Sequence, residues 1–215
     1  VAAETLLRHA AVASGKPGSF TGAAANLQAW LTARGLWASG QKILDASGLA
    51  PGSKLTPAVL AGAIRLALTD PAYAPIIAGL PVAGESGTLE HRFDDKSEAV
   101  ARGNVHAKTG TIVGVASLAG YLTTADGARL VFAEIANRTS GQNSAYNWLD
   151  RSAAAAPGNR IAARLFSILV ILVFAVPTLL IVGSTNADAI SLGDLAGTWW
   201  RVFPDPGRYW GDGMW

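Results

Sequence analysis

The sequence predicts an α/β fold: one lobe in which an antiparallel sheet is covered by helices, followed by a single apolar helix of membrane-spanning length. Three observations predict it. Helix-type patterns occupy the N-terminal part of the chain and return after residue 142. Between them lie three consecutive segments rich in β-branched and aromatic residues, which is typical of strands. From residue 165 the sequence becomes almost entirely apolar, as membrane spans are. The order helices, strands, helix indicates a meander sheet packed by helices over residues 1–156.

Caps and apolar spacing predict the helices. The first ends before Gly15, and Gly35 is suited to end the second. Thr56 and Pro57 open a third helix, because threonine can cap it and proline fits the first helical position. The expected helices are Ala2–Ala13, a cap at Thr21 through Arg34, Thr56–Pro57 through Leu68, and Asn143–Ala156.

Strands are predicted where β-branched and aromatic residues run between turn residues. Asp126-Gly127 between two such runs is a strong hairpin signal. The expected strands are Lys42–Asp45, the segment Val105–Thr111, Val115–Thr124 and Arg129–Asn137. Two connections are also expected, an irregular one over Pro71–Gly84 and one with a short helix beginning in Ser86–Leu89.

Composition excludes several classes of function. Of the 215 residues, 15% are charged and the net charge is +2. Because no basic run is interleaved with aromatic residues, we expect no nucleic-acid partner. The absence of cysteine excludes a disulfide, a thiolate nucleophile and a Cys-ligated zinc site. The histidines His9, His91 and His106 share no ligand spacing, so we expect no metal and no other cofactor.

The segment around Lys108 carries the residues with the clearest chemical use. Lys108 offers a compact ammonium and Thr109 a hydroxyl, and together they can bind a carboxylate. Gly110 has no Cβ, so the backbone of a ligand can lie close to the strand. The backbone N–H of Thr111 would point to the same space, where an oxyanion could form. A Lys-Thr-Gly triplet alone also fits an ordinary solvated strand, so the rest of the chain decides its interpretation.

Residues 165–183 have the length and composition of a membrane span. They contain no charged residue and would extend roughly 28 Å as a helix, close to a hydrocarbon thickness of about 30 Å. A buried core helix is one alternative. Another is a signal-peptide-like segment, in which Arg160 and Arg164 precede the apolar run and Ala187–Ala189 follows it. The remaining parts are a linker, 157–164, and a tail of unknown role, 184–215.

Several spaced motifs, in order, resemble the C-terminal portion of the class C penicillin-binding proteins, the D-alanyl-D-alanine carboxypeptidases/endopeptidases. The resemblance covers residues 1 to about 155 and implies an incomplete penicillin-binding transpeptidase-like lobe. The motifs are Asp45–Leu49, Leu80–Gly84 with Gly87–Leu89, Ala107–Thr111 and Gly114–Tyr121.

The resemblance implies a serine-type peptidase. In that family a serine paired with a lysine attacks a peptide carbonyl, and the resulting acyl-enzyme is hydrolysed. Lys108 and Thr109 would bind the terminal carboxylate of a peptidoglycan stem peptide or of a β-lactam. The N–H of Thr111 would supply half of the oxyanion hole, and Lys108, Thr109, Gly110 and Thr111 together form the expected substrate-binding set.

The family's other two elements are where the sequence departs. Ser39-Gly40-Gln41-Lys42 matches Ser-x-x-Lys formally, but the nucleophile belongs at the start of a buried helix, and here glycine and a strand follow. Ser184-Thr185-Asn186 matches Ser-x-Asn but lies after Lys108, in the wrong order. Because Ala3–Arg8 resembles what normally follows Ser-x-Asn, we expect the chain to begin downstream of both elements and to contain no nucleophile.

Other polar residues have ordinary structural interpretations. Asp45 and Ser47 are expected to fix a turn by local hydrogen bonds. His106 shares a strand face with the lysine of the triplet and is expected to be a rim residue. Glu85 and Glu90 are expected to be exposed.

Two functions remain open. The chain is either a fragment of a serine-type carboxypeptidase/endopeptidase carrying its Lys-Thr-Gly strand, or a non-catalytic, membrane-anchored remnant or binding module. The resemblance implies the cell envelope, on the extracytoplasmic side. Arg151, Arg160 and Arg164, which precede the possible membrane span 165–183, would instead hold the lobe in the cytoplasm by the positive-inside rule.

Overall fold

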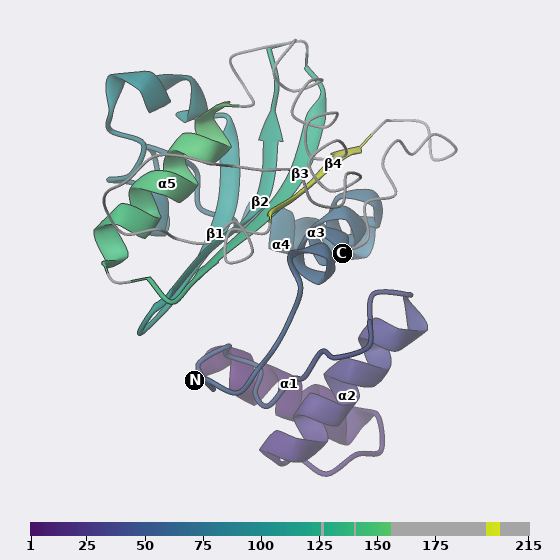
Figure 1. The fold of residues 1–215 in the computed structure, drawn as a ribbon. Helices are drawn as coiled ribbons and strands as arrows, with labels where there is room; N and C mark the ends of the chain where they lie inside the picture. Colours follow the sequence, from purple (N-terminus) through teal and green to yellow (C-terminus); the bar gives the residue numbers. More distant parts are fainter. Residues whose placement is uncertain (126, 140, 156–196, 203–215) are drawn as a thin grey trace, which may run out of the picture.

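A computed structural model describes residues 1–125, 127–139, 141–155 and 197–202, the last as backbone (Figure 1). Its α-helices are α1 (Ala2–Ala13), α2 (Phe20–Ala33), α3 (Pro57–Thr69), α4 (Ala74–Ala78) and α5 (Gln142–Ala155). Its 3-10 helices are η1 (Pro71–Tyr73), η2 (Gly87–Leu89) and η3 (Lys96–Ala101). Its strands are β1 (Val105–Ile112), β2 (Val115–Thr123), β3 (Arg129–Asn137) and β4 (Gly197–Val202).

The strands form one antiparallel sheet in the order β1-β2-β3-β4. The β1–β2 hairpin closes through Val113 and Gly114, where Gly114 has a φ of 72°, a conformation that glycine adopts without strain. The three-strand meander is therefore confirmed. The sheet is larger than predicted, because β4 from the C-terminal tail pairs with β3, with Arg129 opposite Val202.

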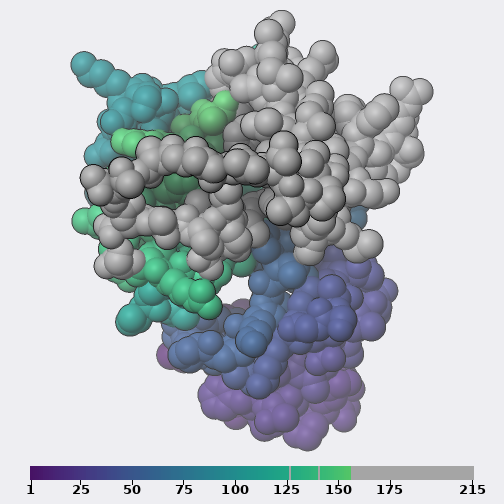
Figure 2. Space-filling view, viewed as in Figure 1, coloured from purple at the N-terminus to yellow at the C-terminus, as the bar shows by residue number. Residues whose placement is uncertain are grey.

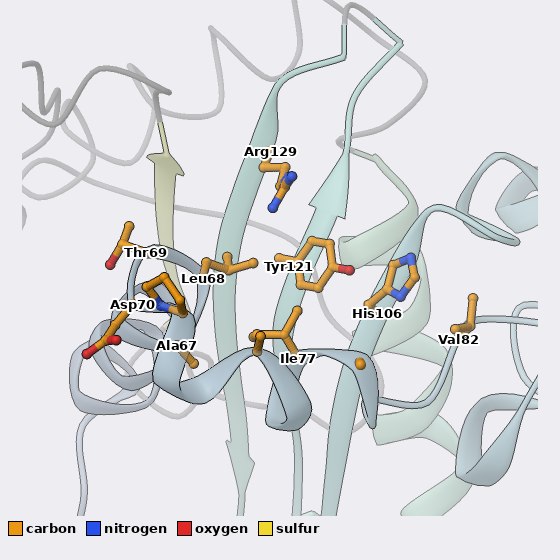
Figure 3. A pocket seen from close by; sticks show the side chains of 12 residues that line it. Ala67, Leu68, Thr69, Asp70, Ile77, Val82, His106, Tyr121 and Arg129 are labelled. Carbon is orange, nitrogen blue, oxygen red and sulfur yellow. The ribbon is translucent and has the colours of Figure 1, made fainter.

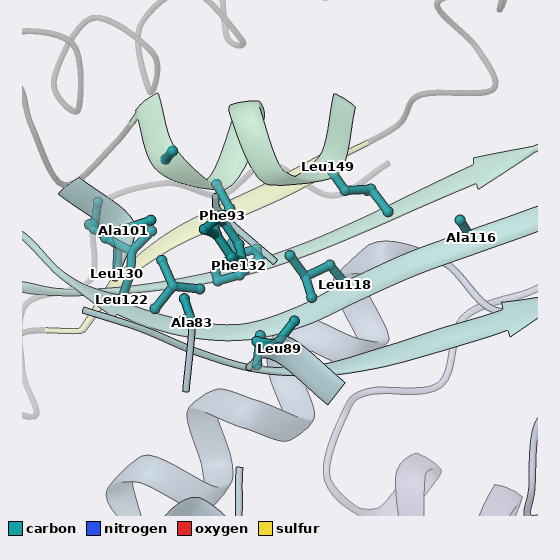
Figure 4. Close-up of a cluster of buried hydrophobic side chains, with 14 of the residues drawn as sticks. Ala83, Leu89, Phe93, Ala101, Ala116, Leu118, Leu122, Leu130, Phe132 and Leu149 are labelled. Atoms are coloured by element: carbon teal, nitrogen blue, oxygen red, sulfur yellow. The ribbon is translucent and has the colours of Figure 1, made fainter. Parts of the chain in front are cut away.

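The two faces of the sheet are buried by different helices. One face packs against α5 and the segment before β1, and its core includes Leu89, Phe93, Leu118, Phe132 and Leu149, all at most 1% exposed (Figure 4). Full burial of a side chain of this size contributes about 1.5–3 kcal/mol. On the other face, residues of α3 pack against β2 and β3. The sheet is thus fixed from both sides.

Helices α1 and α2 pack against each other at the N-terminal, purple end of the molecule (Figures 1 and 2). The helix α1 agrees with its predicted bounds. The cap of α2 was predicted wrongly: Ser19, rather than Thr21, has extended backbone and accepts a hydrogen bond from the Gly22 N–H at 3.0 Å. Thr21 lies inside the first turn, where its side chain cannot cap that helix end.

Two other predictions require correction. The connection Pro71–Gly84 is not wholly irregular, because it contains η1 and α4. Asp70 caps η1 by accepting a hydrogen bond from the Ala72 N–H at 2.9 Å. The predicted strand Lys42–Asp45 is reduced to a single bridge between Lys42 and Lys54. The other predicted helix start, Thr56 followed by Pro57, is confirmed at α3.

No helix within the described ranges is both long and apolar enough to cross a membrane. The predicted span 165–183 and the linker 157–164 lie outside the described residues, as does the tail 184–215 apart from β4.

Glu134 of β3 is an ionisable residue buried in the core. Its side chain is 1% exposed, and its Oε1 accepts a hydrogen bond from Ser152 Oγ of α5 at 2.6 Å. Burial raises the pKa of Glu134 to about 8, although the Ser152 hydrogen bond lowers it, and Asp150 raises it further. The carboxyl group is therefore mostly protonated at neutral pH.

This raised pKa predicts that stability falls as pH rises. The folded state keeps a proton that the unfolded state releases near its ordinary pKa of 4.5, so the contribution is fully present below that pH and lost as pH rises through about 8. We expect Glu134→Gln to remove most of this slope in the free energy of unfolding, measured by denaturant titration between pH 5 and 9. The matched control is Glu90→Gln at an exposed position. Equal slopes in wild type and Glu134→Gln would contradict the assignment.

Candidate functional site

The candidate site is the outer edge of β1. This strand is an edge strand of the sheet and pairs with a neighbouring strand, β2, on one side only. Its other edge is covered at the start, where the Ala107 N–H donates to the Pro81 carbonyl and the Ala83 N–H donates to the Val105 carbonyl, both at 2.9 Å. These two bonds show that residues 105 and 107 direct their backbone groups outward.

The covering ends at residue 107. Because backbone groups alternate along a strand, Thr109 and Thr111 also direct their N–H and C=O groups outward. In the part of the chain that the structure describes, no other backbone group pairs with them on that edge. The edge of β1 from Thr109 onward is therefore open to pairing with an extended peptide.

Lys108 places its charge at this open edge. Its side chain is exposed, and Nζ donates a hydrogen bond to the Thr109 carbonyl at 2.7 Å. The ammonium thus lies beside the first outward-facing backbone group and does not enter the core. A carboxylate arriving at the edge could replace the carbonyl as its partner.

The hydroxyl groups of Thr109 and Thr111 lie on the α5 side of the sheet, the opposite face from Lys108. Thr109 Oγ1 donates to Thr88 Oγ1 of η2 at 3.1 Å. Thr111 Oγ1 and the hydroxyl of Tyr146 on α5 are 2.9 Å apart. Each threonine is tied to a different neighbouring element, so both ends of the open edge are fixed in position.

Gly110 lies between them on the face of Lys108. A Cβ atom at this position would collide with Ser117 Oγ on the adjacent strand β2. A larger residue here would therefore force the Ser117 hydroxyl to move, a packing constraint that the sequence alone did not reveal.

A buried ion pair supports the edge from behind. Arg92 donates through Nε to Asp150 Oδ2 at 3.0 Å, and its Nη2 donates to Asp150 Oδ1. The Arg92 guanidinium also lies 5.0 Å from the centre of the Tyr146 ring, within the range of a cation–π contact. Burial raises the pKa of Asp150, despite the hydrogen bonds from Arg92 that lower it. Asp150, Arg92 and Tyr146 thus connect the core to Thr111.

Sequence reasoning missed this connection. The sequence places Tyr146 and Asp150 only within an expected helix, and it assigns no role to Arg92. The spacing of Tyr146 and Asp150, four positions apart on α5, is the one local signal, because it places both on one helix face.

The Asp45–Leu49 segment forms the expected turn. Asp45 Oδ2 accepts from Ser47 Oγ at 2.6 Å and from the Leu49 N–H at 2.8 Å. Burial by itself would raise the pKa of Asp45, but these hydrogen bonds outweigh it and lower the pKa. Glu4 of α1 accepts from the N–H groups of Ala46 and Ser47 at 2.8 and 2.9 Å. The turn role is confirmed, and the turn is tied to α1.

The remaining candidates take these positions. His106 is half-buried on the same face as Lys108 and stacks on Tyr121, while Glu85 and Glu90 are exposed as expected. Ser39 is exposed in a turn with Gly40 and does not begin a helix. Ser184-Thr185-Asn186 lies outside the described residues. In residues 1–125, 127–139 and 141–155, no three His, Asp or Glu side chains are grouped to hold a metal ion.

Comparison with known proteins gives consistent matches. The sequence profile of the D-Ala-D-Ala carboxypeptidase 3 (S13) family matches residues 1–156. Carboxypeptidase DacB of Mycolicibacterium smegmatis is 40% identical over 140 residues, which are 64% of this chain and 30% of that protein. The D-alanyl-D-alanine carboxypeptidase of Actinomadura sp. is 32% identical over 144 residues, which are 65% of this chain and 26% of that protein. The chain thus spans less than a third of either relative.

A solved structure shows the same fold. Penicillin binding protein 4 (dacB) from Haemophilus influenzae, crystallised with a β-lactam, superimposes with a TM-score of 0.61 at 24% identity. The match covers 70% of this chain and 36% of that one.

The support of Thr111 can be tested by Tyr146→Phe. Loss of the hydroxyl removes one hydrogen bond, so we expect the free energy of unfolding to fall by about 1 kcal/mol. The NMR order parameter of the Thr111 backbone should fall as well, because its side chain is no longer held. Tyr73→Phe, at another half-buried tyrosine, is the control that should change neither quantity. An unchanged Thr111 order parameter in Tyr146→Phe would show that the contact does not fix the edge.

Proposed function

The chain belongs to the D-Ala-D-Ala carboxypeptidase 3 (S13) family, and we propose that it supplies the substrate-binding strand of a serine-type D-alanyl-D-alanine carboxypeptidase. The proposed substrate is the stem peptide of peptidoglycan, and a β-lactam would occupy the same place. The observation that carries the proposal is the open edge of β1, with Lys108 at its beginning. Action on peptidoglycan would place this lobe in the cell envelope, on the extracytoplasmic side.

The edge suits the end of a peptide for two reasons. An extended peptide can pair with the outward N–H and C=O groups of Thr109 and Thr111, as an added strand. Its terminal carboxylate can then form a charge-assisted hydrogen bond with the ammonium of Lys108 at the strand edge. The hydroxyl of Thr109 would join this contact only by giving up its hydrogen bond to Thr88. A peptide that lacks the carboxylate would lose this second set of contacts.

The N–H of Thr111 has a catalytic part in the proposal. Attack of a serine oxygen on the peptide carbonyl places negative charge on the carbonyl oxygen, and a fixed N–H donor stabilises that charge. The connection from Asp150 through Arg92 and Tyr146 holds Thr111 before the reaction begins. A donor that is already in position pays no reorganisation cost in the transition state.

The nucleophile itself belongs to another part of the protein in this proposal. Ser39 is exposed in a turn, where neither a helix start nor a buried lysine would activate it. The relatives contain more than twice as much sequence as this chain matches, which leaves room for Ser-x-x-Lys and Ser-x-Asn elements outside it.

Labelling with a fluorescent penicillin tests the location of the nucleophile. We expect no covalently labelled band when the whole chain is incubated with the reagent, because an acyl-enzyme requires an activated serine. A labelled band that disappears in Ser39→Ala would contradict the proposal and identify Ser39 as the nucleophile.

Non-covalent binding tests the strand independently of the nucleophile. In a calorimetric titration with diacetyl-Lys-D-Ala-D-Ala, we expect Lys108→Ala to weaken binding about tenfold or more, the effect of one lost charge-assisted contact. Lys54→Ala, at an exposed lysine 54 positions before Lys108, is the matched control and should bind the peptide as wild type does. The same peptide with a C-terminal amide should bind wild type as weakly as the acid binds Lys108→Ala. Equal affinity of wild type for acid and amide would refute recognition of the carboxylate.

A further inference from the structure

We propose that a pocket on the α3 side of the sheet binds a small monocarboxylate with a planar, apolar body. The pocket has a volume of about 390 Å³ and lies where the end of α3, η1 and α4 meet the sheet (Figure 3). This volume is in the range of small-molecule sites. The residues that line it do not include Lys108, Thr109 or Thr111, so it is distinct from the open edge of β1.

The sheet provides a polar floor from three adjacent strands. His106 of β1 lies opposite Tyr121 of β2 in the register, and their rings stack with centroids 4.7 Å apart and planes 6° from parallel. Arg129 of β3 lies on the same face, two residues from the register partner of Tyr121. Figure 3 shows the three side chains beside one another along this floor. A ligand lying on it meets aromatic surface and a guanidinium together.

The opposite wall is largely apolar, although Thr69 and Asp70 also belong to it. It is built by the last turn of α3 and by α4, with contributions from the segment that covers the start of β1. Its apolar side chains are Ala67, Leu68, Ala74, Ile77, Ala78 and Val82. The part of a ligand that contacts these side chains therefore needs to be apolar.

The charges in the pocket select one anionic group. Arg129 is exposed, and no carboxylate of the described residues lies within salt-bridge distance of it. Burial lowers the pKa of His106 even though Glu85 raises it, so His106 is neutral at pH 7 and adds no second cation. Asp70 also lines the pocket and repels a further negative charge. A single carboxylate at Arg129 fits this arrangement.

The experiment uses 3-phenylpropionate as the probe and the whole chain, labelled for NMR. We expect saturable shifts of the His106 and Tyr121 ring signals. The neutral analogue 3-phenylpropanamide has the same apolar body and should bind about tenfold more weakly, because it lacks the charge-assisted contact. This comparison needs no variant, so it does not depend on the folding of one. Absence of saturable shifts at millimolar probe, or equal affinity for the two compounds, would overturn the proposal.

Variants assign the carboxylate contact. Arg129→Gln should weaken binding of 3-phenylpropionate about tenfold and leave the binding of the amide unchanged. Arg138→Gln, at an exposed arginine just beyond the other end of β3, is the matched control and should bind both probes as wild type. Unchanged binding of the acid by Arg129→Gln would also overturn the proposal. The stem-peptide titration tests Lys108 at the open edge of β1, whereas the probe titration tests Arg129 in the pocket. A negative result at one site therefore does not affect the result at the other.

Discussion

The candidate site depends on an unequal pairing of β1. One edge of this strand is bonded along its length to β2, and the other is covered by Pro81–Ala83 only as far as residue 107. A central strand could not receive a peptide, and a fully free edge would be open to pairing with any other chain. Partial cover leaves a short open segment, and Lys108 places a positive charge where that segment begins. The open segment and its charge are the basis of the proposal that this edge binds the carboxylate end of a peptide.

The rest of the lobe keeps this edge in place. Helix α5 buries one face of the sheet and reaches Thr111 through Tyr146, while α3 buries the other face. Two buried acids have partners: Asp150 pairs with Arg92, and Oε1 of Glu134 accepts from Ser152. Oε2 of Glu134 has no hydrogen-bond partner among the described residues. Glu134 is kept neutral by its surroundings, since an ionised carboxylate would be costly in this core. Stability and site geometry therefore depend on the same helix, α5.

Much of the fold could be predicted because its signals are local. The bounds of β3 follow from a run of β-branched and aromatic residues, and α3 begins where a Thr-Pro pair indicates. Local signals also misled in specific ways. Ser19 and Thr21 are both possible caps, and only the backbone conformation decides for Ser19. The two prolines, Pro71 and Pro75, indicate an irregular connection, yet each fits the first turn of a short helix.

What could not be predicted arises from contacts distant in sequence. Tyr146 meets Thr111 across 35 positions and Arg92 meets Asp150 across 58, so no spacing rule relates them. The pairing of β4 with β3 likewise joins the tail to the sheet, and nothing in the tail indicates its partner. The Lys-Thr-Gly residues were found from their chemistry, but the contact of Thr109 with Thr88 follows only from the tertiary structure.

The open edge of β1 is tested most directly by the position of a bound peptide. In an NMR study of the labelled chain with an unlabelled acyl-D-Ala-D-Ala peptide, we expect intermolecular nuclear Overhauser effects from the peptide to the amide protons of Thr109 and Thr111. Contacts confined to other parts of the sheet, with both of these amides unaffected at saturation, would contradict this expectation.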